Sequence, residues 1–337
     1  MSLYGIDGED AFSVIASSYI SSFPTKSSER LSEIHARGKA IATKYGIRAD
    51  HMEETHGITE KDAEGEMLPI LYQHFLSKRF RETSGKFFTP KPIAKSMAHL
   101  LIPFEDAMIV DPCCGSGTFL RAASETWGNM KCQLVGNDID PLLIDLTELS
   151  LSMTVPSHQS YRLLRTNMYE PHEEITGIYG KADYILANPP FSIPVHSFYG
   201  ESELYELGYR NSDALFLDLA HRLLKPSGRL VCLLPHSIVT NDEYIELRQK
   251  TEERWFLLGV VTLPEGVFYT TAKTSTRADI LVLEKMGDIC APEKSFFCHV
   301  SSVGVPLRNH SKGVAENQLV DLVSSKDIQD ILTSRRT

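Results

Sequence analysis

The stretch AMIVDPCCGSGTFL, residues 107–120, decides the fold class of this 337-residue chain. It begins as a β-rich apolar run and continues, after Gly115 and Gly117, into a stretch with helical spacing. Glycines let the backbone approach a ligand closely, and the start of a helix offers free N–H groups. A dinucleotide site would need a third glycine where Leu120 stands. The stretch therefore predicts a strand, a turn and a helix, in which the turn is either structural or a different kind of ligand cradle.

The same alternation continues along the rest of the chain. Further β-rich runs occupy residues 132–137, 182–187, 229–234, 257–263 and 278–283, with helical stretches at 141–151, 213–224 and 241–251. Strands that alternate with helices are joined by right-handed crossovers and form a mostly parallel, doubly wound sheet. Such sheets bind ligands beyond the carboxyl ends of their strands. We therefore predict an α/β fold and expect the chemistry in the loops that follow the strands.

The patterning predicts three regions. Residues 8–80 carry apolar side chains at helical spacing and few β-rich runs, which predicts a helical N-terminal region over residues 1–84. The alternating part predicts a catalytic domain over residues 85–301, and residues 302–337 read as a polar tail with one amphipathic helix. At roughly 150 residues per domain, the length fits two domains or one large domain with an extension.

The composition excludes several classes of protein. Hydrophobic residues make up 42% of the chain and charged residues 23%, which excludes wholesale disorder. No uncharged apolar run reaches about 18 residues, and the acidic N-terminus lacks the apolar core of a secretory signal. The six cysteines include no C-x-x-C pair and no cluster with zinc spacing. We therefore expect a cytoplasmic protein with no transmembrane helix and no metal site.

The charge of the chain is unevenly distributed. The net charge of −10 argues against a protein that coats nucleic acid, because lysine and arginine at phosphates supply most of that affinity. Residues 67–99 nevertheless hold six basic side chains and one acidic side chain. This basic segment is either the solvated face of a helix or a phosphate-contacting patch beside an active site.

Two acidic residues stand at successive predicted strand ends. Asp111 precedes the glycine turn, where a carboxylate suits a cationic ligand better than a pyrophosphate. Asp138 ends the next strand, within GNDIDP at residues 136–141, where an acid commonly binds ribose hydroxyls. The glycine turn and the two acids together predict an adenosine ligand that carries a positive centre, namely S-adenosylmethionine.

The tetrapeptide Asn188-Pro189-Pro190-Phe191 follows the predicted strand at 182–187 and indicates the reaction. Its two prolines stiffen the turn, so the Asn188 side-chain oxygen and the Pro189 carbonyl are held as fixed acceptors. Two acceptors can bind both hydrogens of a planar NH2 group and favour a tetrahedral nitrogen, whose lone pair then points at the sulfonium methyl. Phe191 can stack on the flat substrate, and catalysis needs only positioning and electrostatics. A plain rigid turn would explain the prolines but not the asparagine.

Six ordered motifs give the chain a resemblance to the N6-adenine DNA methyltransferases, specifically to the modification subunit of type I restriction–modification systems. The motifs are GKFFTP (85–90), DPCCGSG (111–117), GNDIDP (136–141), NPPF (188–191), LKPSGR (224–229) and LPEGVF (263–268). The resemblance covers residues 65 to 300, approximately, and implies a Rossmann-like S-adenosylmethionine-dependent methyltransferase fold. It also implies methyl transfer to the N6 amino group of adenine in DNA. The target base must be flipped out, because its amine is not accessible inside the stacked duplex.

The candidate site residues follow from the motifs and from the resemblance. The NPPF tetrad is assigned to catalysis. The resemblance implies that Phe88, Thr89 and Pro90 lie over the methionine end of the cofactor, and that Phe268 stacks on the flipped adenine. Cofactor binding is further assigned to Asp111, Cys113, Gly115, Gly117, Asp138, Ile139, Asn167 and Met168.

Asn167 departs from the pattern of the family that the chain resembles. That family usually places an aspartate here to bind the amino group of the cofactor adenine. The amide oxygen of Asn167 can still accept a hydrogen bond, but it is a weaker acceptor than a carboxylate.

No target-recognition module is visible in the sequence. Direct readout of DNA needs a dedicated surface in the major groove, and the predicted sheet edge is taken by the cofactor. We therefore expect DNA as the substrate and a separate specificity subunit, docked through the helical N-terminal region or the tail helix. A restriction subunit is the further candidate partner. The acidic net charge agrees with phosphate affinity that is shared with a partner.

Three alternatives stay open. Protein-glutamine and ribosomal-RNA methyltransferases also use an Asn-Pro-Pro tetrad, but the glutamine enzymes typically have tyrosine where Phe191 stands, and neither class normally carries the FFTP element. A C5-cytosine enzyme would need Cys113 as its nucleophile, yet this residue lies inside the cofactor turn. A non-catalytic methyltransferase-like subunit is favoured by Asn167 and opposed by the intact tetrad.

Overall fold

The computed structural model describes residues 5–22, 28–59, 67–75, 88–268, 276–287, 291–307 and 316–334. The chain divides into two compact units. The first holds Met1–Ser84, Gly115–Gly117 and Asp140–Pro156, and the second holds Gly85–Cys114, Thr118–Ile139 and Ser157–Thr337. The predicted boundaries of a catalytic domain and a tail stay predictions. None of the described helices combines the length and the apolar character that crossing a membrane requires.

The first unit is helical, as the apolar spacing predicts. Its helices are α1 (Gly8–Ser22), α2 (Glu29–Lys44), α3 (Ala49–Thr59), α4 (Leu68–Phe75) and α8 (Pro141–Thr154). Phe12 of α1 and Tyr72 of α4 are buried edge to face, with ring centroids 5.4 Å apart. Ser28 caps α2 at Leu31 N and donates a hydrogen bond to Glu148 of α8 at 2.7 Å. Burial of the apolar faces stabilises helices that are too short to be stable alone.

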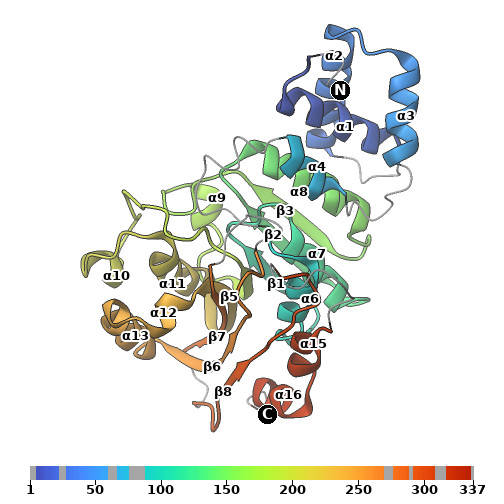
Figure 1. Ribbon diagram of the computed structural model, residues 1–337. Helices are drawn as coiled ribbons and strands as arrows, with labels where there is room; N and C mark the ends of the chain where they lie inside the picture. Colours follow the sequence, from blue (N-terminus) through green and yellow to red (C-terminus); the bar gives the residue numbers. More distant parts are fainter. Residues whose placement is uncertain are drawn as a thin grey trace. The chain divides into compact units, whose positions relative to one another are not determined.

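The second unit is built on one eight-stranded sheet with the order β3-β2-β1-β4-β5-β7-β6-β8 (Figure 1). The strands are β1 (Ala107–Asp111), β2 (Cys132–Asn137), β3 (Ser160–Leu164), β4 (Ala182–Ala187), β5 (Leu224–Pro235), β6 (Trp255–Thr262), β7 (Ala278–Lys285) and β8 (Phe296–His299). Strands β1 to β5 are parallel, β7 is antiparallel to β5 and β6, and β8 is parallel to β6. The predicted mostly parallel α/β sheet is confirmed. The predicted β-rich runs included neither β3 nor β8, and β8 is a four-residue edge strand on which Phe297 is 69% exposed.

Helices cover both faces of this sheet. The described helices of the second unit are α6 (Lys91–Ala98), α7 (Thr118–Trp127), α9 (Glu173–Thr176), α10 (Glu203–Glu206), α11 (Ser212–Leu223), α12 (His236–Thr240), the 3-10 helix η2 (Asp242–Tyr244), α13 (Ile245–Glu252), α15 (Gln318–Val323) and α16 (Lys326–Thr333). Successive side chains of β4 point to opposite faces. The Tyr184 ring meets Trp127 of α7 at 5.6 Å, whereas Ile185 lies in one buried cluster with Leu215 of α11. Helices α7 and α11 therefore cover opposite faces.

The tail residues are part of the second unit. They form two helices where the apolar spacing predicts one, because α15 ends at Val323 with Ser324 as its C-cap, and Ser325 is the N-cap of α16. Buried Arg229 of β5 pairs with Glu284 of β7 at 3.2 Å and donates to the carbonyl of Leu332 at 2.8 Å. A buried guanidinium needs such partners to offset its desolvation. This contact ties α16 to the sheet.

Candidate functional site

The strand order places two predicted motifs at the same edge of the sheet. Strands β1 and β4 are hydrogen-bonded neighbours in parallel register, with Ile109 opposite Tyr184. The chain continues from β1 to β2 on one side and from β4 to β5 on the other. This switch point is where open α/β sheets bind ligands. The turn that starts at Pro112 and the NPPF tetrad both leave the sheet there.

One buried asparagine holds together the loops after three strands. Asn137, 2% exposed, donates through Nδ2 to the carbonyls of Pro112 at 3.0 Å and Thr166 at 3.1 Å. Its Oδ1 accepts hydrogen bonds from Thr166 N at 3.0 Å and Thr166 Oγ1 at 2.9 Å. Sequence reasoning did not assign Asn137 a role, although an amide at the buried end of a strand is a signal for such a tie.

The turn requires its two glycines. Gly115 and Gly117 have φ values of +53° and +74°, which residues with a Cβ rarely adopt. Within the first unit, a Cβ on Gly117 would lie 2.8 Å from Cγ2 of Thr147. The Thr147 hydroxyl also donates to the carbonyl of Gly115 at 2.8 Å. The backbone geometry agrees with the predicted glycine turn, while the role of the two residues in cofactor binding stays a prediction.

Asp111 is a buried carboxyl group with an unused oxygen. It is 1% exposed; Oδ1 accepts a hydrogen bond from Cys113 N at 3.2 Å, and Oδ2 accepts none from the described residues. Its pKa is raised to about 8, chiefly by burial and also by the carboxyl of Asp138, although the Cys113 N–H lowers it. A cationic ligand would supply the missing partner and favour the ionised form. The donor set therefore fits the positive end of S-adenosylmethionine.

The thiol of Cys113 is not prepared to act as a nucleophile. Burial and the neighbouring carboxyls of Asp111 and Asp138 raise the pKa of Cys113 well above its ordinary value. A thiol in such surroundings stays protonated and unreactive. This observation weighs against the C5-cytosine alternative.

Asp138 and Ile139 are adjacent but differ in exposure. Asp138 is 7% exposed at the end of β2, whereas the Ile139 side chain is 57% exposed. An exposed isoleucine beside a buried acid would gain from an apolar ring laid over it. The pair fits the adenosine part of the predicted cofactor.

Asn167 and Met168 are placed less favourably than the sequence predicts. The Asn167 Oδ1 accepts a hydrogen bond from Tyr169 N at 3.1 Å, and its Nδ2 donates to Glu170 at 2.9 Å. The amide therefore closes a local turn, and its oxygen has only its remaining lone pair for a ligand. Met168 is 7% exposed and lies in the hydrophobic cluster that includes Val110. Only the small exposed part of this core side chain would be available for the predicted contact with the cofactor.

The structure brings the FFTP and NPPF motifs into contact. Asn188 follows β4 and donates through Nδ2 to Thr89 Oγ1 at 3.1 Å, across 99 residues of sequence. This bond orients the amide, whose oxygen Oδ1 can only accept hydrogen bonds. Phe88 and Thr89 are buried at 8% and 7% exposure, and Pro90 precedes α6 as its N-cap. Gly85, Lys86 and Phe87 lie outside the described residues.

The two aromatic residues assigned to the substrate also meet. Phe191 and Phe268 are edge to face, with centroids 6.3 Å apart at an angle of 89°. Phe191 is 6% exposed and Phe268 is fully buried, so neither ring presents an open face. Stacking of Phe268 on a flipped base would require the two rings to separate.

The predicted basic segment is described only in part. Lys78, Arg79, Arg81, Glu82 and Lys86 lie outside the described residues. Lys95 on α6 forms an ion pair with Glu125 at 2.5 Å, which offsets its charge. This pair agrees with a solvated helix face better than with a phosphate-contacting patch.

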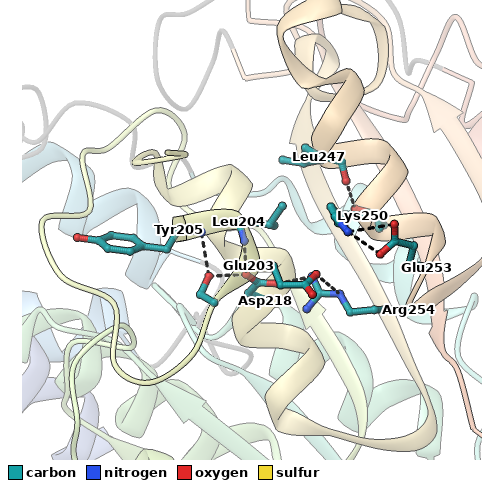
Figure 2. Close-up of polar contacts among 10 residues, drawn as sticks. Glu203, Leu204, Tyr205, Asp218, Leu247, Lys250, Glu253 and Arg254 are labelled. Atoms are coloured by element: carbon teal, nitrogen blue, oxygen red, sulfur yellow. Dashed lines mark hydrogen bonds and ion pairs between the residues drawn. The ribbon is translucent and has the colours of Figure 1, made fainter. Parts of the chain in front are cut away.

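The segment between the tetrad and α11 is folded onto the second unit. Ser202 caps α10 and donates a hydrogen bond to buried Asp218 of α11, which also accepts from Leu204 N at 3.2 Å and from Arg254 (Figure 2). The Arg210 guanidinium lies 3.6 Å from the centroid of the Tyr205 ring. These contacts pack α10 on α11 and α13.

Comparisons with known proteins agree with the fold and the motifs. The chain is 26% identical over 254 residues to the type I restriction enzyme MjaVIII methylase subunit of Methanocaldococcus jannaschii, covering 71% of this chain and 42% of that protein. It is 27% identical over 196 residues to the type II methyltransferase M.VspI of Vibrio sp., covering 57% and 47%. The chain thus spans less than half the length of either relative.

Solved structures share the fold. The methyltransferase subunit of a type I restriction–modification system from Streptococcus thermophilus aligns with a TM-score of 0.57 at 19% identity, covering 91% of this chain and 63% of that chain. A protein assigned as a class I S-adenosylmethionine-dependent methyltransferase from Listeria monocytogenes aligns with a TM-score of 0.60 at 19% identity, covering 97% and 98%. Residues 59–329 match the family described as N-6 DNA methylase. The chain belongs to the N-6 DNA methylase family.

Proposed function

We propose that this chain transfers a methyl group from S-adenosylmethionine to the N6 amino group of adenine in DNA, as the modification subunit of a restriction–modification system. The observation that carries the proposal is the Asn188 amide, fixed by Thr89 at the switch point of the sheet. The relatives named as restriction–modification methylases support the assignment to DNA.

Asp111, Asp138 and Ile139 would hold the cofactor. The buried Asp111 carboxyl would pair with a positive group, Asp138 would accept from ribose hydroxyls, and Ile139 would cover the adenine. When bound, S-adenosylmethionine supplies an electrophilic methyl group on a positively charged sulfur.

The tetrad would bind and orient the attacking amine. The Asn188 Oδ1 and the Pro189 carbonyl each accept one N–H, which turns the nitrogen lone pair toward the methyl carbon. The N–C bond forms, the C–S bond breaks with its electron pair going to sulfur, and the nitrogen then releases a proton to water. No covalent bond to the protein is needed, so the rate depends on how rigidly these acceptors are held.

A separate specificity subunit would supply sequence recognition, and a restriction subunit is the further candidate partner. One relative and one structural neighbour are named as subunits of type I systems. The net charge of −10 would leave much of the phosphate affinity to such a partner.

The decisive experiment follows labelled methyl groups from S-adenosylmethionine into DNA, RNA and protein, with and without the products of neighbouring genes. We expect the label at N6 of adenine in DNA, with poor transfer when the specificity partner is left out. Label found only in RNA or protein would refute the proposal in favour of the other amine methyltransferases.

The variant Asn188→Ala tests the acceptor role within the same assay. We expect kcat to fall about 100- to 1000-fold, the range for the loss of one preorganised hydrogen-bonding group. Cofactor affinity measured by calorimetry should stay within about twofold, because Asn188 touches the amine and not the cofactor in this mechanism. The matched control is Asn241→Ala, an exposed asparagine after α12, which should keep the wild-type rate. Retained activity in Asn188→Ala contradicts the mechanism.

A further inference from the structure

The tetrad is held at its exit as well as at its start. At its start, β4 pairs with β5 through Ala187 and Cys232, and Asn188 bonds Thr89. At its exit, Ser192 has a φ of +55°, a left-handed conformation that residues with a Cβ rarely adopt. Such a conformation persists only where the surrounding structure imposes it. Residues that contact the exit of the tetrad must therefore impose the left-handed conformation of Ser192.

Ser212, the first residue of α11, bonds both sides of this exit. Its hydroxyl donates to the carbonyl of Pro190 and accepts from Ile193 N at 3.1 Å. Its own N–H donates to the carbonyl of Ile193 at 2.8 Å. One serine, 1% exposed, therefore fixes the peptide groups on either side of Phe191 and Ser192.

Asp213, the next residue of α11, is a second buried polar residue at this point. It is 1% exposed. Burial raises the pKa of Asp213, and the nearby backbone N–H groups of Asp213 itself, Ser192 and Ala214 oppose that rise. The carboxyl group therefore lies beside the peptide groups at the exit of the tetrad.

Helix α11 is a rigid support for these two residues. Its buried side chains include Leu215, Phe216 and Leu219, each at most 1% exposed. Asp218, one turn further along, is anchored by Ser202, Leu204 and Arg254 (Figure 2). Tyr169 also donates through its hydroxyl to the carbonyl of Ser212 at 2.7 Å. The start of α11 is therefore fixed from several sides.

We propose that Ser212 and Asp213 are positioning residues for methyl transfer: the start of α11 sets the place of Pro190 and Phe191, and through them aims the acceptors of the tetrad. The proposal rests on the proposed function. It assigns these residues no contact with substrate or cofactor. Because the rate of methyl transfer depends steeply on the distance between the reacting atoms, small shifts of the tetrad are expected to lower the rate of the chemical step.

The first test compares Ser212→Ala with Ser202→Ala in the complex with its specificity partner. Both variants remove a buried serine hydroxyl that makes two hydrogen bonds, but only Ser212 touches the tetrad. We expect kcat of Ser212→Ala to fall about 10- to 100-fold, with the KM for S-adenosylmethionine unchanged within about twofold. The Ser202→Ala control should keep kcat within about threefold even where its melting temperature falls. Equal kcat values in the two variants would overturn the proposal.

The second test uses rescue at Asp213 and stays informative where Ser212→Ala fails to fold. Asp213→Ala should lower kcat about tenfold, since the peptide groups at the exit of the tetrad lose a buried polar neighbour. Asp213→Asn should restore most of the rate, because its amide oxygen occupies the same place. An Asn variant as impaired as the Ala variant would contradict the positioning role of Asp213.

Hydrogen exchange separates this proposal from the function on which it rests. The amide of Ile193 bonds Ser212 Oγ, so peptides over residues 188–195 should exchange faster in Ser212→Ala and not in Ser202→Ala. Absence of methyl transfer to any substrate by the wild-type complex would refute the proposed function alone. Unchanged exchange in Ser212→Ala would refute the anchoring alone.

Discussion

Two carboxyl groups of the second unit, Asp111 and Asp218, are equally buried and have opposite surroundings. Asp111 is 1% exposed and Asp218 is 2% exposed. Asp218 accepts hydrogen bonds from Ser202, Leu204 N and Arg254 (Figure 2), so both its oxygens have partners. Asp111 accepts one hydrogen bond from Cys113 N, and among the described residues its Oδ2 has no partner.

The difference separates a carboxyl that holds the fold from one that, in the proposed function, pairs with a cationic ligand. A buried acid with a guanidinium and two further donors stabilises the packing of α10, α11 and the end of α13. A buried acid whose second oxygen has no partner among the described residues lowers the stability of the fold, and in the proposed function a bound cation would offset that cost. Three predictions test this contrast.

The largest expected effect is on stability. Asp218→Ala would leave Arg254 without its main partner and should lower the free energy of unfolding by about 2–4 kcal/mol. The cost falls below that of a fully buried pair because the Arg254 side chain is 23% exposed and keeps Glu203 within 4.0 Å. Urea unfolding measures the loss, and calorimetry on the folded variant should show an unchanged affinity for S-adenosylmethionine. An Asp218→Ala variant as stable as the wild type would contradict the assignment of Asp218 to stabilising the fold.

The next effect is on affinity. Asp111→Asn keeps the shape of the side chain and removes the charge, so the affinity for S-adenosylmethionine should fall about 10- to 100-fold. The free energy of unfolding should stay the same or rise, since the unsatisfied buried carboxyl is gone. Calorimetry and urea unfolding on the same sample give both numbers. Unchanged affinity would remove Asp111 from the cofactor site.

The smallest effect, taken over one pH unit, is the pH dependence. The pKa of Asp111 is raised by burial from its ordinary value of 3.8 to about 8 in the folded chain, so the folded state holds the proton to higher pH. The contribution of Asp111 to the free energy of unfolding is fully present below about pH 4. As the pH rises from about 4 to about 8, this contribution is lost by up to about 1.4 kcal/mol per pH unit. A cation binds the ionised form, so affinity for S-adenosylmethionine should rise with pH up to about 8, at most tenfold per unit.

Two controls sharpen the pH measurement. Calorimetry at pH 6, 7, 8 and 9 should give a flatter profile for Asp111→Asn than for the wild type. The uncharged 5′-methylthioadenosine should show no such rise with pH in either protein. A rise that persists in Asp111→Asn would assign the titration to another group.

Much of the architecture could be predicted because local patterns of residues in short stretches of sequence indicate the strands and the loops. The strands around Asp111, Asp138 and Asn188 are continuous apolar runs, and their loops carry glycine, proline and acidic residues at fixed places. The reversal of β7 and the short edge strand β8 have no such local signal. Strand direction depends on long-range pairing, which periodicity does not encode.

The site was predictable as a set of motifs but not as a set of contacts. The partners of Asn188 and Asp218 lie far from them in the sequence or in segments without a recognisable motif. Ser212 and Asp213 read as an ordinary helix start, and only the structure brings them to the tetrad. Whether a buried acid is satisfied depends on such distant partners, so Asp111 and Asp218 look alike in the sequence.

The Asn137 amide has a consequence for how binding energy is distributed. Its four hydrogen bonds join the segments after β1 and β3 to the end of β2, so a displacement of one segment also displaces the others. Substitutions at the two ends of a bound ligand would then interact instead of summing, since they share one rigid joint. We therefore expect the segments that Asn137 joins to contribute to ligand binding as one cooperative unit, and not residue by residue.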